Sequence, residues 1–198
     1  MRVLRLLFSV LAAASLGPLA LAHAVSVKDS PGYYATPDPE SLSVRLGRRT
    51  NAPHVKMPFT GGARSLDELG RSVVWTLHHG NIDSLRSLCV SQDEFRAILW
   101  REFPQSRPAT GLQWEDAWTF LYARQRAGTN HAMREYGGHP YQFVRFEPGE
   151  STGVYKNFKL HSGLVMVTKD DAGGLARWRW LRSVAERRGR FKIYSTED

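Results

Sequence analysis

The chain has 198 residues, of which 42% are hydrophobic and 23% charged, and this composition is typical of a globular protein with an ordinary packed core. Its formal net charge is +8, but the basic residues are scattered along the chain, so the sequence does not indicate a nucleic-acid partner. The single cysteine, Cys89, excludes an internal disulfide, and the chain has no cysteine pair or His-x-x-x-His spacing that would indicate a zinc site.

Residues 1–24 have the pattern of a signal peptide that is cleaved during export. Two arginines precede an apolar run over residues 6–21, and Ala22-His23-Ala24 supplies the small-x-small pattern before the cleavage point. The alternative is a membrane anchor, but the apolar run is shorter than the roughly 20 residues that a spanning helix needs. We therefore expect a periplasmic or secreted protein with no stable membrane anchor.

Residues 25–62 form a proline-rich arm between the leader and the domain. The arm holds five of the ten prolines, and no apolar period of 3.6 or 2 residues continues along it. Such a segment buries too little apolar surface to offset the entropy lost when it is ordered. We expect it to be flexible, either as a mobile tether or as an arm that lies on the domain.

Capping residues and apolar spacing predict helices from residue 65 onward. Two capping boxes, in which a serine and a glutamate three residues later satisfy free backbone amides, open helices at Ser65 and Ser91. Gly80 ends the first of these helices, Asn81 caps a short helix between them, and Pro104 stops the second.

The longest helix is expected over residues 113–136. Trp114, Trp118 and Tyr122 follow one another at a spacing of four, so they lie on one stripe of this helix. The pair Gly128-Thr129 allows a kink or a division, and the two glycines after residue 136 end the helix.

The apolar pattern then changes to alternation, which predicts four antiparallel strands. They are expected over residues 139–146, 155–167, 175–186 and 191–196, with a turn at residues 148–153, another at 170–174, and a bend near Gly163.

The same alternation assigns side chains to the two faces of the strands. On the first strand it places Phe143 and Phe146 on opposite faces, and on the third it places Trp178 and Trp180 together, opposite two arginines.

Helices followed by a strand meander predict one α+β domain over residues 63–198. Within it, residues 65–195 resemble the nuclear-transport-factor-2-like (cystatin-like) superfamily. The resemblance is carried by SLDELGRSVVWTLHHGNIDSLRSL, which is similar to that family's first two helices, and by WRWLRSVAERRGRFKIYS, which is similar to its last hairpin. It implies N-terminal helices packed on a curved antiparallel sheet of four or more strands, which forms a cone with a cavity at its wide end.

The resemblance leaves the function open. Members of the superfamily include isomerases, cyclases, dehydratases and many non-catalytic binding or dimerising domains, and they share no catalytic motif that can be aligned with this chain. It implies a homodimer through the outer face of the sheet.

Glu102 is a candidate catalytic residue because it falls on the apolar stripe of the helix that begins at Ser91. A buried carboxylate there would have a raised pKa and could act as a general acid or base, whereas the simpler interpretation is that it tilts into solvent or pairs with an arginine. His139 and His161, on predicted strands, are candidate partners in an acid–base pair, although a structural role is the simpler interpretation of both.

The aromatic side chains are the candidates for ligand binding. Trp114, Trp118, Tyr122 and Tyr141 would line the wall of a cavity and favour a flat or apolar ligand, although aromatic residues more often serve packing. No glycine-rich phosphate loop and no Gly-x-Ser-x-Gly motif occurs, so the sequence indicates neither a nucleotide cofactor nor serine hydrolysis.

These observations favour an exported, non-catalytic domain that binds a small apolar ligand or a protein partner, without a cofactor. Two alternatives remain: an isomerase, cyclase or dehydratase that uses a buried carboxylate, and an interaction module of the cell envelope.

Overall fold

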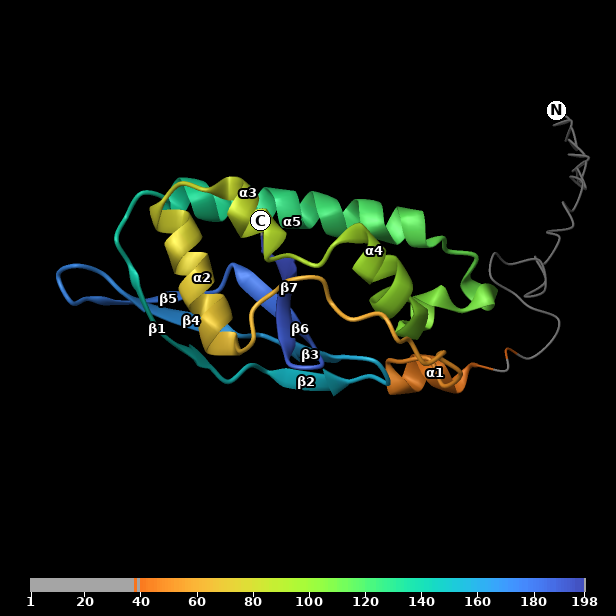
Figure 1. Cartoon of the computed structure of the whole chain (residues 1–198). Coiled ribbons are helices and arrows are strands. Elements are labelled where there is room, and N and C mark those ends of the chain that lie inside the picture. The colour runs from red at the N-terminus through yellow and green to blue at the C-terminus, as the bar shows by residue number, and fades with distance from the viewer. Residues whose placement is uncertain (1–37, 39, 198) are drawn as a thin grey trace, which may run out of the picture. The chain divides into compact units, whose positions relative to one another are not determined.

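The structure is a computed structural model that describes residue 38 and residues 40–197 (Figure 1). The predicted signal peptide and the first part of the proline-rich arm lie outside the described residues. Within the described part of the chain, no helix combines the length and the apolar character needed to cross a membrane.

The helices precede the strands along the chain, as predicted. They are α1 (Leu42–Leu46), α2 (Leu66–His78), α3 (Ile82–Ser87), α4 (Gln92–Glu94) and α5 (Trp114–Tyr136). Helix α4 continues into a π-helical turn, Phe95–Leu99, and short 3₁₀ turns follow at Trp100–Glu102, Pro104–Ser106 and Pro108–Thr110.

The capping signals explain where these helices begin and end. Ser91 and Glu94 form the complete capping box that was predicted, and the Asn81 side chain accepts a hydrogen bond from the Ser84 amide at 2.9 Å. The box predicted at Ser65 is incomplete, because the Glu68 carboxylate accepts from the Arg64 amide instead.

Helix α5 is continuous, so no division occurs at Gly128-Thr129. Gly128 is needed for close packing instead, since a side chain there would collide with Thr196 on the last strand. The hydroxyl of the fully buried Thr129 donates to the Gln125 carbonyl at 2.7 Å, which satisfies it inside the helix.

The strands form two antiparallel sheets, which confirms the α+β class. The three-stranded sheet has the order β1-β4-β5, with β1 (Gln142–Glu147), β4 (Val165–Lys169) and β5 (Leu175–Trp178). The four-stranded sheet has the order β2-β3-β6-β7, with β2 (Ser151–Val154), β3 (Lys159–Ser162), β6 (Leu181–Arg187) and β7 (Arg190–Thr196).

Two of the predicted strands are each divided between the two sheets. The strand expected over residues 155–167 is β3 and β4, interrupted at Gly163, whose φ is 72°. The strand expected over residues 175–186 is β5 and β6, interrupted at residues 179–180. Strand β2 lies where a turn was predicted, so the sequence-based prediction missed it.

The predicted alternation fails on β1. A bulge between Phe143 and Arg145 in the pairing with β4 adds one residue to β1 and reverses the faces beyond it. The Phe143 and Phe146 rings therefore lie 5.3 Å apart and both pack on the core, which corrects their assignment to opposite faces.

The described part of the arm, residue 38 and residues 40–62, includes α1 and then runs along the domain from α1 to α2 (Figure 1). Its backbone is held by side chains of the domain. The Asn157 side chain accepts from the Val55 amide at 2.8 Å, and the Arg187 guanidinium donates to the carbonyls of Val55 and Met57 at 2.6 and 2.8 Å. Arg187 is only 3% exposed, so these carbonyls replace the water that its charge has lost.

Candidate functional site

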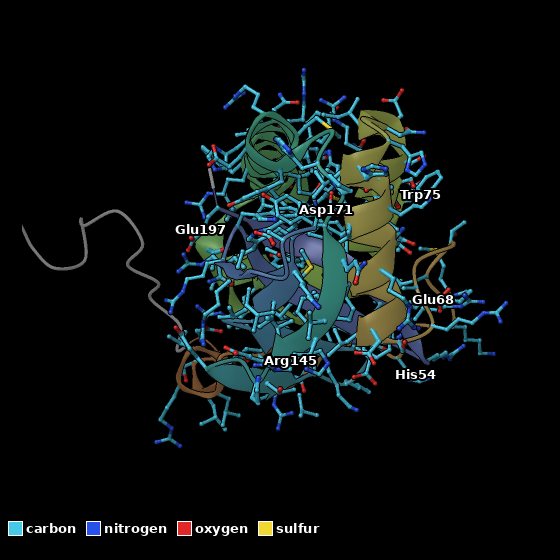
Figure 2. The ribbon with its side chains drawn as sticks, turned by 90° about the vertical axis from the view of Figure 1, so that its left-hand side faces the viewer. His54, Glu68, Trp75, Arg145, Asp171 and Glu197 are labelled. Atoms are coloured by element: carbon cyan, nitrogen blue, oxygen red, sulfur yellow. The ribbon has the colours of Figure 1, made fainter. Side chains whose placement is uncertain are left out.

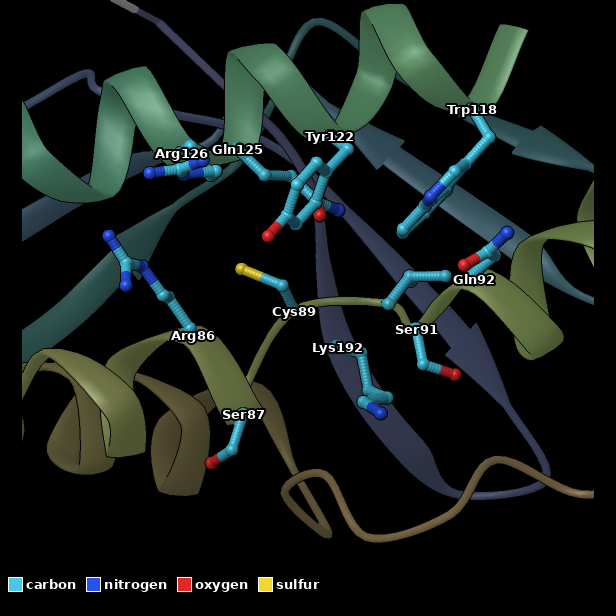
Figure 3. A pocket seen from close by; sticks show the side chains of 11 residues that line it. Arg86, Ser87, Cys89, Ser91, Gln92, Trp118, Tyr122, Gln125, Arg126 and Lys192 are labelled. Atoms are coloured by element: carbon cyan, nitrogen blue, oxygen red, sulfur yellow. The ribbon is translucent and has the colours of Figure 1, made fainter. Parts of the chain in front are cut away.

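A groove of about 290 Å³ lies between α5 and the segment that joins α3 to α4 (Figure 3). The lining residues come from three parts of the chain that are distant in sequence: Arg86, Ser87, Cys89, Val90, Ser91, Gln92, Trp118, Tyr122, Gln125, Arg126 and Lys192.

Aromatic side chains of α5 form one wall of the groove. The Trp118 and Tyr122 rings stack with their centroids 5.7 Å apart and their planes at 24°, because residues four apart lie on one helix face. Phe95 packs behind Trp118 with the ring centroids 5.6 Å apart, which fixes the indole, whereas Tyr122 is 47% exposed.

The opposite wall contains the thiol of Cys89, whose sulfur points toward α5 in Figure 3. The neighbouring Val90 amide donates to the Ile193 carbonyl at 2.9 Å, so β7 fixes this extended segment. Burial raises the pKa of the Cys89 thiol to about 12, despite the opposing charges of Lys192 and Arg86. The thiol is therefore protonated at neutral pH, and it acts as a small apolar surface rather than a nucleophile.

A buried ion pair supports the groove. Lys192 and Glu94 meet at 2.8 Å with side chains that are 4% and 1% exposed. Glu94 also accepts from the amides of Ser91 and Thr60, and Lys192 also donates to the Thr60 carbonyl. Because a buried pair needs such additional bonds to compensate for lost hydration, the charge of Lys192 is fully engaged by the protein.

The four aromatic residues predicted to bind a ligand are not brought together. Trp118 and Tyr122 line the groove, but the Trp114 ring lies beneath the Arg96 guanidinium, 5.4 Å away, and is not part of the lining. Tyr141 lines a separate hollow of about 330 Å³ together with Trp75. Figure 2 shows Trp75 on the outer side of α2, where it is 53% exposed.

Glu102 is buried, with 1% of its surface exposed, so the expectation that it tilts into solvent or pairs with an arginine was wrong. Its two carboxylate oxygens accept from the backbone amides of Lys156 and Asn157 at 2.5 and 2.6 Å. It also contributes, after burial, to the raised pKa of Tyr155. Glu102 therefore fixes the turn before β3, and both of its oxygens are occupied.

Among the residues that the structure describes, His161 has a carboxylate partner and His139 has none. His161 lies on β3, with Nε2 2.9 Å from a Glu186 oxygen on β6 and Nδ1 3.2 Å from the Thr152 hydroxyl on β2. His139 is exposed in the turn before β1. Thr152 was missed because β2 was not predicted, and cross-strand pairing is the signal that would have found it.

The environment of Glu186 has two opposing effects on its pKa. Burial raises the pKa of this carboxyl, but the hydrogen bonds from His161 and Lys159, which are 2.9 and 3.2 Å long, outweigh it and hold the pKa below its ordinary value. This group of side chains lies outside the groove.

The groove residues that the sequence did not reveal include most of the polar ones, among them Arg86, Gln125, Arg126 and Lys192. They come together only through the packing of α3, α5 and β7, so no local pattern could have identified them.

Within the part of the chain that the structure describes, no group of three or more His, Cys, Asp or Glu side chains could hold a metal ion. Comparisons of the chain with protein-family models, with curated proteins and with solved structures found no match. The resemblance to the nuclear-transport-factor-2-like superfamily stays a prediction, and the function must be argued from the geometry of the groove.

Proposed function

We propose that the protein is an exported, non-catalytic binding domain that holds a small apolar molecule in the groove. The observation that carries the proposal is the Trp118–Tyr122 stack facing the Cys89 thiol across a space of about 290 Å³. Export is supported by the leader pattern of residues 1–24.

The walls of the groove suit an apolar molecule better than a reactive one. Stacking on Trp118 and Tyr122 removes flat apolar surface from water, which contributes roughly 25 cal/mol for each Å² buried. The volume is at the lower end of the range of about 300–1,000 Å³ for small-molecule sites, which favours a compound of one or two rings. The protonated Cys89 thiol supports binding without covalent chemistry.

We also infer that the two sheets are halves of one bent layer, as the resemblance implies. Two observations support this. The Gly163 amide, at the break between β3 and β4, donates to the Arg182 carbonyl of β6 at 2.9 Å. The hydrogen bonding between β3 and β6 therefore continues past the end of β3, toward β4. Helix α5 reaches both sheets, since Gly128 packs on Thr196 of β7 and the Tyr136 ring stacks 4.1 Å from Trp178 of β5.

A second candidate function is acid–base catalysis at His161. A histidine held between a carboxylate and a hydroxyl has the arrangement of a general base, and the Glu186–His161–Thr152 contacts favour this alternative. We place it second because none of these three residues lines the groove.

Binding of the neutral two-ring compound 2-naphthamide, followed by calorimetry, tests the main proposal. We expect saturable binding that is lost in Trp118→Ala. The matched control is Phe120→Ala, since Phe120 is on the same helix, is 73% exposed and is not part of the groove lining. Binding that is equal in both variants would place the ligand elsewhere and would refute the proposal, whereas a loss confined to His161→Ala would favour the second candidate.

A further inference from the structure

Two arginines stand at one end of the groove. Arg86 comes from α3 and Arg126 from α5, and Figure 3 shows them on opposite walls of the same end, with Trp118 toward the other end. The Arg126 guanidinium lies over the Tyr122 ring, 5.8 Å from its centroid. A cation–π contact of this kind keeps the charge beside the aromatic wall.

No carboxylate lines the groove among the described residues, although three cationic side chains do. Lys192 is neutralised by Glu94 at 2.8 Å. Among the described residues, Arg86 forms an ion pair with Asp83 at 3.9 Å, and the Asp83 side chain is 92% exposed. Exposed pairs of this length contribute little. The end of the groove therefore has excess positive charge.

Arg86 also has an unfilled hydrogen-bond donor. One of its terminal nitrogens donates to the Asn130 side chain at 2.9 Å, but its Nε is buried and has no partner within the described ranges. Buried polar groups are nearly always hydrogen-bonded, and the guanidinium fork matches the two oxygens of a carboxylate. An oxyanion in the groove would bind the other terminal nitrogen of the fork, Nη1, whose acidic contact among the described residues is the 3.9 Å pair with the exposed Asp83.

We propose that the groove selects an amphiphilic anion, namely a small molecule with a flat apolar body and one carboxylate. The apolar body lies on Trp118 and Tyr122, and the carboxylate lies between Arg86 and Arg126. This inference rests on the proposed function and adds the chemical class of the ligand.

The experiment compares two probes of nearly the same shape, 2-naphthoate and 2-naphthamide, on the full chain at neutral pH by calorimetry. We expect the carboxylate to bind at least about tenfold more tightly, because hydrogen bonds to charged groups are the strong ones. Its advantage should shrink as salt is added, since salt screens exposed charges over about 10 Å at 0.1 M.

Variants of the arginines separate charge from shape. Arg86→Gln and Arg126→Gln should each lower the affinity for 2-naphthoate about tenfold and leave that for 2-naphthamide unchanged. Arg124→Gln is the control, because Arg124 is exposed on α5 and is not part of the groove lining. Arg86→Gln could fail to fold because it loses the contact with Asn130. In that case Arg126→Gln provides the test, because Arg126 is exposed and its replacement does not disturb the packing.

The possible results separate this inference from the function on which it depends. Equal affinity for the two probes, or an equal loss of both in Arg126→Gln, would overturn the selection of an anion and leave apolar binding intact. If neither probe binds, or if Trp118→Ala binds both as well as the wild type, the groove is not a ligand site and both proposals fall.

Discussion

Replacing Glu102 with glutamine tests whether a buried carboxylate fixes the turn before β3. In the wild type, its oxygens accept from two backbone amides, those of Lys156 and Asn157. Glutamine has one oxygen and one NH₂ group, so one amide would face another donor. With only 1% of the side chain exposed, water does not replace the missing acceptor.

The size of the effect follows from these contacts. A hydrogen bond to a charged group contributes about 1.5–3 kcal/mol, and a buried donor left without a partner costs about 1–3 kcal/mol. We therefore expect Glu102→Gln to lower the free energy of unfolding by about 3 kcal/mol. Since 1 kcal/mol shifts the Tm of a domain of this size by about 2–4 °C, the Tm should fall by about 6–12 °C.

Urea unfolding followed by far-UV circular dichroism measures this loss. Glu135→Gln is the matched control, because Glu135 is exposed on α5 and its replacement should change the free energy of unfolding by less than about 0.5 kcal/mol. A Glu102→Gln protein as stable as the wild type, or more stable, would show that the carboxylate is not held by the two amides and would refute this account.

Two further predictions concern charged groups outside the groove. Glu186→Gln should reduce stability at neutral pH. Burial raises the pKa of Glu186, but its hydrogen bonds, chiefly the one from His161, lower the pKa by more. The contribution of the Glu186 carboxylate to the free energy of unfolding is therefore present above the pKa of the unfolded chain, and it is lost as the pH falls through the lower pKa of the folded protein. The urea midpoints of the variant and the wild type should thus converge as the pH is lowered. A difference that stays constant with pH would contradict a lowered pKa for Glu186. Arg187→Met should speed proteolytic cleavage within residues 52–60, relative to the exposed Arg179→Met, as measured by mass spectrometry. Equal cleavage would mean that the arm is held by other contacts.

The helices could be predicted because their signals are local. The caps at Asn81 and Ser91 and the helix end at Gly80 each involve backbone groups within one helical turn. A short window of sequence therefore contains both the capping residue and the amides or carbonyls that it satisfies. Gly128 shows the limit of this reasoning, because the same residue that suggests a helix break is required by the approach of β7.

The sheets were predicted less well because alternation does not reveal which neighbour a strand pairs with. Residues on both sides of Gly163 alternate in the same way, yet they belong to different sheets. The bulge at Phe143 and Arg145 adds a single residue, and nothing in the local pattern marks it.

Two of the four aromatic candidates line the groove, whereas most of its polar residues were not identified from the sequence. The spacing of four correctly places Trp118 and Tyr122 on one helix face, but it gives the same place to Trp114, which lies outside the groove lining. Glu102 is buried as its position on an apolar stripe suggested, although it lies in a 3₁₀ turn and not in a regular helix. Its partners are backbone amides more than 50 residues away, and a main-chain group carries no side-chain signal.

The bonds that hold the arm also dictate when the domain can be completed. Asn157, Arg187 and Lys192 bind its backbone across separations of about 100 residues or more, and Arg187 and Lys192 belong to the hairpin of β6 and β7. The stretch over residues 40–62 therefore leaves the ribosome long before these partners exist. The arm of a nascent chain therefore stays unsecured until residues 187 and 192 have been made.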